Sequence, residues 1–318
     1  MTPPVAIAVV SWNTRALLDA CLSSMRADAR DARAEVWVVD NGSIDGSPEM
    51  VAERHRWAHL MRAEENLGFG RAVNRVAAQT DAPWIAAANA DIALTPPALA
   101  RLLDAGARDP RAGAIAPRLL LPDGTTQPSV QEFPSLRDSV LSALRLRPGG
   151  ARRWDLDRPA GVPWATGAFL LLRRTAFEQA GRFDERQWLY AEDLDLCWRL
   201  GRKGWSVRYE PSAHVRHEEN AATAQALGTD FDETWLRATY AWQAEVQGVR
   251  RTWAAALVEL AACTPRLWVL GLLAPRSPER FAHRALAARQ AAVAARFGLR
   301  APSDLLRPPS PPVEGRRQ

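Results

Sequence analysis

Cysteine is scarce in this sequence of 318 residues. The three cysteines, Cys21, Cys197 and Cys263, are widely spaced and form no C-x-x-C pair. This pattern argues against a disulfide framework and against a zinc site, and it fits a reducing compartment. With 47% apolar and 24% charged residues, the composition also excludes a disordered chain or a fibrous repeat. The length allows one large domain with an appendage, or two domains.

No apolar run is long enough to cross a membrane. The best candidate, residues 253–274, is interrupted by Glu259, Pro265 and Arg266, whereas a spanning helix needs about 20 predominantly apolar residues. The chain starts with Met1 and enters an apolar run without the basic region and cleavage site of a signal peptide. We therefore expect a cytoplasmic protein, with attachment to the cytoplasmic face of the inner membrane as the alternative.

Lysine is nearly absent, and the positive charge is concentrated toward the C-terminus. Lys203 is the one lysine among 41 basic residues, and the formal net charge is +5. Residues 241–318 hold 12 arginines and five acidic residues, a net charge of +7. The overall charge is too small for a chain of this length to require a nucleic-acid partner, and no such partner is expected.

What the sequence does contain is an alternation of short apolar runs with helix-like stretches. The apolar runs cover residues 5–10, 35–39, 59–62, 84–88 and 112–116. Such alternation is typical of βαβ units. It predicts an α/β fold with a mostly parallel sheet that carries helices on both faces.

Polar residues gather where three of these runs end. Residues 11–13 (Ser-Trp-Asn) follow the first run, residues 40–43 (Asp-Asn-Gly-Ser) the second, and residues 89–91 (Asn-Ala-Asp) the fourth. In open parallel sheets the ligand lies beyond the carboxyl ends of the strands. The three clusters are therefore expected to line one crevice.

The pattern loosens between residues 119 and 163, where proline and glycine interrupt the chain. A loop of that length is usually functional or mobile. After it, a buried strand is predicted at residues 164–172, followed by helices at 174–180 and 191–203. A further strand is predicted at residues 205–209.

Asn89 and Asp91 lie two residues apart at the end of an apolar strand. In this spacing both side chains point to one side of the strand, where the carboxylate can bind a hard divalent cation that bridges phosphates. Taken alone, the tripeptide would more often be an Asx turn. The polar clusters at the neighbouring strand ends favour the ligand site.

Two loops carry features suited to a nucleotide. Asp40 can accept the imide N–H of a uracil or thymine ring, although its segment is also typical of a turn with a helix cap at Ser47. The glycines of residues 66–70 (Asn-Leu-Gly-Phe-Gly) allow the backbone to approach a phosphate, and Arg71 adds positive charge. Position 73 is valine, so the dinucleotide-binding G-x-G-x-x-G pattern is absent.

Acidic residues are dense at the start of a predicted helix. Glu192, Asp193 and Asp195 lie within four positions, where compensation of the helix dipole is worth about 0.3–1 kcal/mol each. Helical geometry places Glu192 and Asp195 on one side and Asp193 elsewhere. A carboxylate in this segment can deprotonate a hydroxyl. His217, after a strand-like segment, is either a structural histidine or a metal ligand.

Taken in order along the chain, these motifs resemble those of the family 2 glycosyltransferases. The resemblance covers about residues 5–220 and is greatest for the rhamnosyltransferase-type members that act in bacterial cell-surface polysaccharide synthesis. It rests on VSWN at 10–13, VVDNGS at 38–43, NLGFG at 66–70 with Asn74, NAD at 89–91, WATGA at 164–168, GRFDE at 181–185, ED at 192–193, and His217.

The resemblance implies a GT-A fold that binds a nucleoside-diphosphate sugar, preferably a dTDP- or UDP-sugar, together with Mg²⁺ or Mn²⁺. The implied donor-binding residues are Ser11, Asn13, Asp40, Asn66, Gly68, Arg71, Asn89 and Asp91. Among them, Asp40 would contact the base, Asn89 the ribose or diphosphate, and Asp91 the metal. His217 would be a further ligand of the metal or of the diphosphate. The Asp-x-Asp usual in the family is Asn-Ala-Asp here, which leaves one fewer anionic ligand.

The same resemblance makes Asp193 the general base that activates an acceptor hydroxyl, so that attack inverts the anomeric carbon. Trp164, Gly167 and Glu192 would line the pocket for the sugar and the acceptor, a glycan or a polyprenyl-linked glycan. One alternative is a catalytically silent sugar-nucleotide-binding or scaffold protein, against which the presence of both Asp91 and Asp193 argues. Another is a sugar nucleotidyltransferase, which the lack of a Gly-rich triphosphate loop disfavours.

The C-terminal part lies beyond these motifs. We expect a catalytic domain at residues 1–220, a helical appendage at 221–306 and a disordered Pro- and Arg-rich tail at 307–318. Tryptophans and arginines are interleaved in the appendage at Trp235, Arg237, Trp242, Arg250, Arg251, Trp253, Arg266 and Trp268. Such helices are typical of contact with an anionic membrane surface, or of packing on the catalytic domain or another subunit.

Overall fold

The computed structural model describes residues 2–144, 154–218, 231–273, 293 and 295. The chain forms two compact units. The first comprises Met1–Phe133, Arg153–Trp188 and Glu192–Gly228, and the second comprises Pro134–Arg152, Leu189–Ala191 and Thr229–Gln318. The tail predicted to be disordered, residues 307–318, lies outside the described residues.

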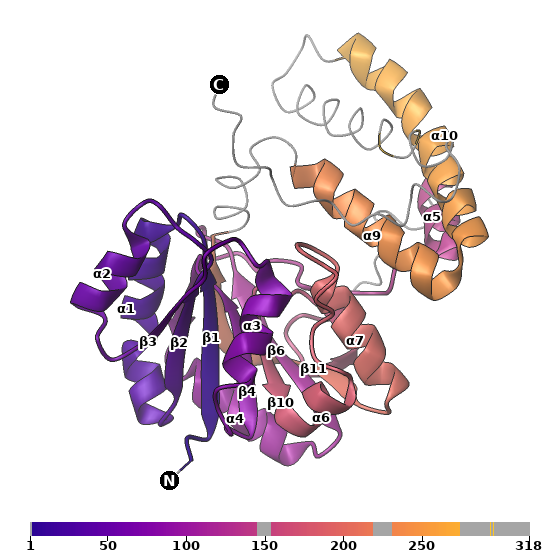
Figure 1. Cartoon of the computed structure of the whole chain (residues 1–318). Coiled ribbons are helices and arrows are strands. Elements are labelled where there is room, and N and C mark those ends of the chain that lie inside the picture. The colour runs from indigo at the N-terminus through magenta and orange to yellow at the C-terminus, as the bar shows by residue number, and fades with distance from the viewer. Residues whose placement is uncertain (1, 145–153, 219–230, 274–292, 294, 296–318) are drawn as a thin grey trace. The chain divides into compact units, whose positions relative to one another are not determined.

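The first unit is built around a central sheet (Figure 1). Within the described residues this sheet has nine strands in the order β3-β2-β1-β4-β10-β6-β11-β5, and β8 pairs with β11. Its strands are β1 (Val5–Ser11), β2 (Glu35–Asp40), β3 (His59–Arg62), β4 (Trp84–Asn89), β5 (Ile92–Thr95), β6 (Ala112–Leu120), β8 (Ala160–Val162), β10 (Phe169–Arg173) and β11 (Ser206–His217). A small separate sheet pairs β7 (Val130–Gln131) with β9 (Trp164–Ala165).

Helices cover the sheet and pack against its buried strands. They are α1 (Arg15–Asp31), α2 (Ser47–Arg54), α3 (Phe69–Ala77), α4 (Ala98–Arg108), α6 (Arg174–Gln179) and α7 (Glu192–Arg202). The main hydrophobic cluster joins Ile7 and Val9 of β1 to Leu22 of α1 and Leu102 of α4. Helix α3 contacts β1 and β2 from the other face, which Figure 1 shows in front of the sheet. The predicted α/β class is confirmed.

The strands β3, β2, β1 and β4 are parallel, and the rest of the sheet is mixed. Strand β10 lies between β4 and β6 and is antiparallel to both. The run predicted as one strand at residues 164–172 is wrong, because β9 ends at Ala165 and β10 begins at Phe169. The turn between them, residues 166–168, uses its backbone groups for hydrogen bonds outside the strand ladder. The strand predicted at 205–209 continues to His217 as β11.

The helix cap expected at Ser47 is also wrong by one residue. Helix α2 begins at Ser47, and its N-cap is Gly46 in the left-handed conformation, with φ of 82°. The Asp45 side chain holds this corner, since Oδ1 accepts from the Ser47 backbone N–H at 3.0 Å and from its hydroxyl at 2.6 Å. Pro48 follows in the first turn, where no intrahelical N–H is needed.

The second unit consists of helices α5 (Leu136–Ala143), α9 (Phe231–Gln247) and α10 (Val249–Leu273) in its described part. Glu259 of α10 accepts hydrogen bonds from the Tyr240 hydroxyl of α9 and, at 2.7 Å, from the Ser139 hydroxyl of α5. No helix in the described residues is both long and apolar enough to span a membrane.

Trp242 does not contribute to an aromatic surface of this unit. Its side chain is 2% exposed, whereas Trp235 and Trp253 are 37% and 40% exposed. Trp242 is therefore part of the packing of the unit, and the sequence pattern alone did not separate it from the two exposed tryptophans. The side chains of Arg266 and Trp268 lie outside the described part of the chain.

Candidate active site

The predicted strand-end clusters meet because the register of the parallel strands brings them together. Ser11 lies opposite Asp40 across β1 and β2, and Val10 lies opposite Asn89 across β1 and β4. Asn13 ties the loops after β1 and β2, since its N–H donates to the Ser43 hydroxyl at 2.8 Å. Its Oδ1 also accepts from the backbone N–H of the residue after Ser43, at 2.8 Å. The residues after these strands thus form one edge of the sheet.

Asp40 is buried at this edge, with 2% of its surface exposed. One carboxylate oxygen, Oδ2, accepts from the Ser43 backbone N–H at 3.0 Å. The other, Oδ1, has no hydrogen-bond partner within the described part of the chain. A buried carboxylate oxygen without a donor is costly, so this atom is suited to accept an N–H of a ligand.

Ser11 and Asn66 have protein partners that give them a structural role. The Ser11 hydroxyl lies 2.9 Å from the Thr14 hydroxyl. Asn66 Oδ1 accepts from Asn41 Nδ2 at 3.3 Å and from the Gly68 backbone N–H at 3.0 Å. Both residues therefore shape the loops at the strand ends in the absence of any ligand.

The glycines at the start of α3 are required by close packing within the protein. A Cβ added at Gly68 would lie 2.1 Å from the backbone oxygen of Trp188, and one added at Gly70 would lie 2.8 Å from the Phe183 Cβ. Arg71 Nε donates to a Glu185 carboxylate oxygen at 3.3 Å. The segment of residues 183–188 therefore covers these positions, which is a reason for the glycines that the sequence interpretation missed.

Asp91, directly before β5, lies next to His217, the last residue of β11. Both side chains are buried, and Asp91 Oδ1 is 3.5 Å from His217 Nε2. The other ring nitrogen, Nδ1, is 2.8 Å from Gln127 Oε1. Within the described residues no group of three or more His, Cys, Asp or Glu side chains is arranged around a common metal position. A cation at this pair would need further ligands from a substrate or from water.

The turn of residues 166–168 links three parts of the site through its backbone. The Thr166 N–H donates to the Ser129 carbonyl at 2.9 Å, and the Ala168 carbonyl accepts from the Asn89 N–H at 3.0 Å. Between them, the Gly167 N–H donates to Asp193 Oδ2 at 2.6 Å. The strand end that carries Asn89 and the helix start that carries Asp193 are therefore held by adjacent residues.

Glu192 and Asp193 form a buried acidic pair in which the two carboxyl groups differ. Burial, and next the charge of Asp193, raise the pKa of Glu192 to about 8. Burial also raises the pKa of Asp193, but the N–H groups of Gly167 and Leu194 oppose this by donating to its two oxygens. Burial and the neighbouring charge thus favour the protonated form of Glu192, whereas the two backbone N–H donors favour the charged form of Asp193.

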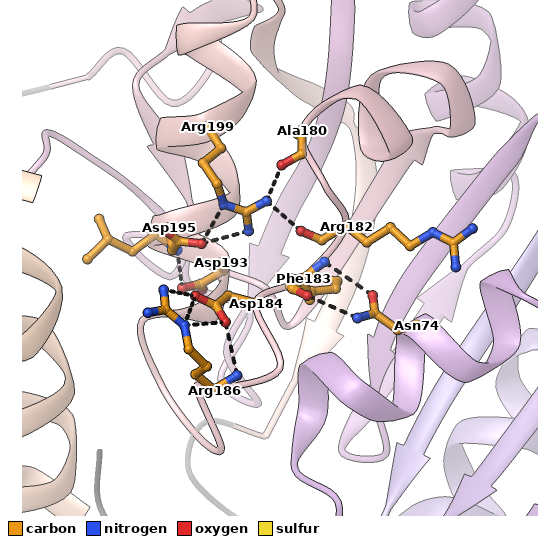
Figure 2. A network of polar contacts seen from close by, with 10 residues as sticks. Asn74, Ala180, Arg182, Phe183, Asp184, Arg186, Asp193, Asp195 and Arg199 are labelled. Carbon is orange, nitrogen blue, oxygen red and sulfur yellow. Dashed lines mark hydrogen bonds and ion pairs between the residues drawn. The ribbon is translucent and has the colours of Figure 1, made fainter. Parts of the chain in front are cut away.

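Asp195, the third acidic residue of this segment, is held in an ion pair. Its Oδ2 accepts from Arg199 Nε at 2.7 Å, and the two residues lie one helical turn apart on α7. Arg199 Nη1 also donates to the carbonyls of Ala180 and, at 2.6 Å, Arg182 (Figure 2). The two aspartates thus have different partners: Asp193 accepts from backbone amides, and Asp195 pairs with a guanidinium.

Asn74 of α3 also binds the loop of residues 180–186, whose carbonyls accept from Arg199. Asn74 Nδ2 donates to the Phe183 carbonyl at 2.9 Å, and its Oδ1 accepts from the Phe183 N–H at 3.1 Å (Figure 2). Asn74 Nδ2 also lies 3.1 Å from Glu185 Oε1. Asn74 and Arg199 therefore attach the loop of residues 180–186, which contains the GRFDE motif, to helices α3 and α7.

Sequence reasoning did not identify Gln127 or Arg199 as parts of the site. Gln127 lies in a Pro- and Gly-containing segment without periodicity, so no local pattern marks it. The spacing of Asp195 and Arg199 by four residues predicts an ion pair on a helix. No sequence pattern predicts the contacts of Arg199 with the carbonyls of Ala180 and Arg182.

Comparison with known proteins identifies the family. The profile described as Glycosyl transferase family 2 matches residues 6–181, and one described as Glycosyl transferase family group 2 matches residues 151–295. The chain belongs to glycosyl transferase family 2 and is a glycosyltransferase, as the sequence motifs indicated.

Two curated relatives are named as rhamnosyltransferases. N-acetylglucosaminyl-diphospho-decaprenol L-rhamnosyltransferase of Mycobacterium tuberculosis is 37% identical over 247 residues, which are 71% of this chain and 79% of the relative. Rhamnosyltransferase WbbL of Escherichia coli is 33% identical over 90 residues, which are 28% of this chain and 34% of that protein. The resemblance to rhamnosyltransferase-type members is therefore confirmed.

Solved structures confirm the GT-A fold. A mannosyltransferase from Pyrobaculum calidifontis, in complex with GDP-Man and Mn²⁺, superimposes with a TM-score of 0.58 at 18% identity and covers 94% of this chain and 88% of its own. GalNAc-T7 with UDP, GalNAc and Mn²⁺ superimposes with a TM-score of 0.56 at 16% identity, covering 78% and 49%. At these identities the likeness concerns the fold.

Proposed function

We propose that this protein transfers a sugar, L-rhamnose as the first choice, from a nucleoside-diphosphate sugar to a hydroxyl of a lipid-linked glycan, with inversion at the anomeric carbon. The relative at 37% identity, named for an N-acetylglucosaminyl-diphospho-decaprenol acceptor, supports the sugar and the acceptor class. One structural observation carries the mechanism: the Asp193 carboxyl group is tied through Gly167 and Ala168 to the strand end that bears Asn89.

The pair of Asp91 and His217 fits a divalent cation. The carboxylate oxygen and the ring nitrogen are 3.5 Å apart, a separation that two ligands of one cation at about 2.0–2.2 Å each can span. Mn²⁺ is the favoured ion, because both solved structures were obtained with it, and Mg²⁺ is the alternative. Such a cation, when bound, neutralises charge that develops on the leaving diphosphate.

Asp193 acts as the base in this proposal. The oxygen of the acceptor hydroxyl attacks the anomeric carbon, and the bond from that carbon to the diphosphate breaks. The hydroxyl proton passes to Asp193. Attack from the face opposite the leaving group inverts the carbon. The backbone N–H groups of Gly167 and Leu194 keep the carboxylate ionised and oriented before the acceptor arrives.

Asp40 selects the donor base in this proposal. Its buried Oδ1, which lacks a hydrogen-bond partner among the described residues, accepts the imide N–H of uracil or thymine. This interaction favours UDP- or dTDP-sugars over donors whose base has no N–H at that place. Asn89, at the end of β4 on the other side of β1, is proposed to contact the ribose or the diphosphate.

We also propose that the second unit binds the surface of an anionic membrane, at the cytoplasmic face, where a polyprenyl-linked acceptor is accessible. Trp235 of α9 and Trp253 of α10 are exposed, and Arg250 and Arg251 are exposed beside Trp253. Aromatic and cationic side chains together favour anionic lipid. Co-sedimentation with vesicles should rise with phosphatidylglycerol content and fall with salt. Packing against another subunit predicts neither dependence.

A donor panel tests the central proposal. Purified protein is incubated with Mn²⁺, a synthetic polyprenyl-diphospho-N-acetylglucosamine and dTDP-rhamnose, UDP-glucose or GDP-mannose, and nucleoside-diphosphate release is measured. We expect acceptor-dependent release from dTDP-rhamnose and an α-to-β or β-to-α change at the transferred sugar. A scaffold protein would bind a donor without release.

The metal site is tested in the same assay with two matched aspartate variants. Asp91→Ala should abolish the Mn²⁺-dependent part of donor binding measured by calorimetry, because a methyl group cannot hold the cation. Asp104→Ala, on the exposed side of α4, is the control and should leave donor binding unchanged. Equal Mn²⁺-dependent binding by both variants would remove Asp91 from the site.

A further inference from the structure

Gln127 is a buried residue whose contacts point to the proposed cation site. It is 6% exposed, and its side-chain oxygen Oε1 lies 2.8 Å from Nδ1 of His217, which is also 6% exposed and 90 residues away in sequence. Neither the motif analysis nor the proposed reaction uses this residue.

The backbone places Gln127 at this position by a tight hairpin after β6. The chain turns at residues 121–125, where the Leu121 N–H donates to the Thr125 carbonyl at 2.9 Å and the Gly124 N–H donates to the Leu121 carbonyl at 2.9 Å. The Gln127 N–H then donates to the Leu119 carbonyl of β6 at 2.9 Å. Strand β6 also pairs with β11, which ends at His217, so the returning chain and β11 both lie against the same end of β6.

The chemistry of the contact determines which ring nitrogen of His217 carries hydrogen. An amide oxygen only accepts hydrogen bonds, so Nδ1 of a neutral imidazole must be the donor to Gln127 Oε1. Nε2 then presents its lone pair, and Asp91 Oδ1 lies 3.5 Å from it. This separation exceeds that of an ordinary N–H···O hydrogen bond, about 2.7–3.2 Å, and suits two ligands of one cation.

We infer that Gln127 is a positioning residue for the cation site: it holds His217 in the Nδ1–H form, so that Nε2 remains a ligand facing Asp91. This inference rests on the metal-dependent reaction proposed above. An outer hydrogen bond of this kind orients a histidine ligand and raises its basicity, and its loss typically weakens metal binding about 10–100-fold.

Three variants at one position separate the positioning role from a packing role. Gln127→Glu keeps an oxygen acceptor for Nδ1–H at nearly the same size, whereas Gln127→Leu and Gln127→Met keep volume and remove the acceptor. Gln179→Leu is the matched control, because Gln179 Oε1 likewise accepts from a ring N–H, that of Trp205 at 2.9 Å, at another place in the fold.

Mn²⁺ binding to the full-length protein is measured by the electron paramagnetic resonance signal of free Mn²⁺, with UDP or dTDP present. We expect Gln127→Leu and Gln127→Met to weaken Mn²⁺ binding about 10–100-fold and Gln127→Glu to bind within about threefold of the unchanged protein. Gln179→Leu should bind like the unchanged protein. In turnover assays the two apolar variants should regain most of kcat at high Mn²⁺, since only occupancy of the site is reduced.

Normal Mn²⁺ binding by Gln127→Leu and Gln127→Met would overturn the inference. If Asp91→Ala and His217→Ala still lose Mn²⁺ in that case, the metal site stands and only Gln127 is misassigned. If those two variants also bind normally, the proposed metal site itself is wrong. Loss of kcat that Mn²⁺ does not restore would indicate a packing role for Gln127.

A second measurement does not depend on the folding of the apolar variants. The ¹⁵N chemical shifts of histidine-labelled unchanged protein report which ring nitrogen is protonated, and His217→Ala assigns the resonance. We expect the Nδ1–H form at His217 before Mn²⁺ is added, with broadening of Nε2 when it is added. A resonance of the Nε2–H form would contradict the inference.

Discussion

The parallel and the mixed parts of the sheet contribute to the site in different ways. In the parallel part, polar residues directly follow the strands, and the register alone places Ser11 beside Asp40. Around the mixed part, single hydrogen bonds fix the polar side chains: the Gly167 N–H donates to Asp193 of α7, and Gln127 contacts His217 of β11. The placement of the residues that follow the parallel strands thus comes from strand pairing, whereas the orientation of the Asp193 and His217 side chains depends on individual hydrogen bonds.

This difference predicts which substitutions change only the chemistry of one side chain and which also move a neighbouring group. A residue at a strand end is positioned by a whole ladder of backbone hydrogen bonds, so its replacement changes the side-chain chemistry and little else. A residue such as Gly167 or Arg199 positions another group, so its replacement moves a neighbour. Four variants in the mixed part test this comparison.

Asp193→Asn is expected to have the largest effect. The amide keeps the shape of the carboxylate but cannot accept the acceptor proton, and loss of a general base typically lowers the rate about 10²–10⁴-fold. Turnover is measured at saturating donor, and donor affinity from calorimetry is expected to stay near the unchanged value. The melting temperature is recorded alongside, because the amide nitrogen cannot accept one of the two backbone N–H groups that the carboxylate accepts. Near-normal turnover would move the base to Glu192.

Gly167→Ala is expected to lower kcat by up to about 10²-fold, the cost of displacing a catalytic group by about 1 Å. The added Cβ would lie 3.1 Å from the Asp193 Cβ and 3.3 Å from its Oδ2, so the carboxylate must shift. Gly161→Ala is the matched control, because a Cβ there meets no atom within 4 Å. Equal kcat values for the two alanine variants would show that Asp193 does not need the Gly167 contact.

Arg199→Met is expected to lower stability rather than to remove a reacting group. It leaves the buried Asp195 carboxylate and the carbonyls of Ala180 and Arg182 without their donor, which costs about 1.5–3 kcal/mol. The free energy of unfolding from urea titration measures the change. Arg202→Met, exposed near the end of α7, should cost little. Similar decreases in the free energy of unfolding for both variants would argue against a stabilising role for the contacts of Arg199.

Glu192→Gln is expected to change how stability depends on pH. The pKa of Glu192 is about 8 in the folded protein, above its ordinary value of 4.5, so the folded state keeps a proton that the unfolded state releases. Stability therefore falls as the pH rises from about 4.5 to 8, and a glutamine has no proton to lose.

The melting temperature of Glu192→Gln relative to the unchanged protein should accordingly increase between pH 5 and pH 8. Glu53→Gln, at an exposed position on α2, serves as the comparison and should give a constant difference. Parallel melting curves of Glu192→Gln and the unchanged protein across this range would contradict the raised pKa.

Much of the donor side was determined by the sequence itself. Apolar runs of strand length followed by Asn89 and Asp91, or by Asp40, predict both the strands and the edge where these residues meet, because parallel strands end on the same side of a sheet. The order of the motifs also identified the family, which the comparisons confirm. These features are local in sequence, so a single chain is enough to recognise them.

Only the tertiary structure decided the roles of the remaining residues. Asp193 and Asp195 are the same residue type two positions apart, and only their partners, Gly167 and Arg199, distinguish a carboxyl group held by backbone amides from half of an ion pair. The sequence predicts a phosphate contact for Gly68, and the fold adds a packing reason for this glycine, because the backbone of Trp188 lies against it. Such contacts join segments far apart in the chain. No local pattern encodes them, since each depends on where the whole fold brings its partner.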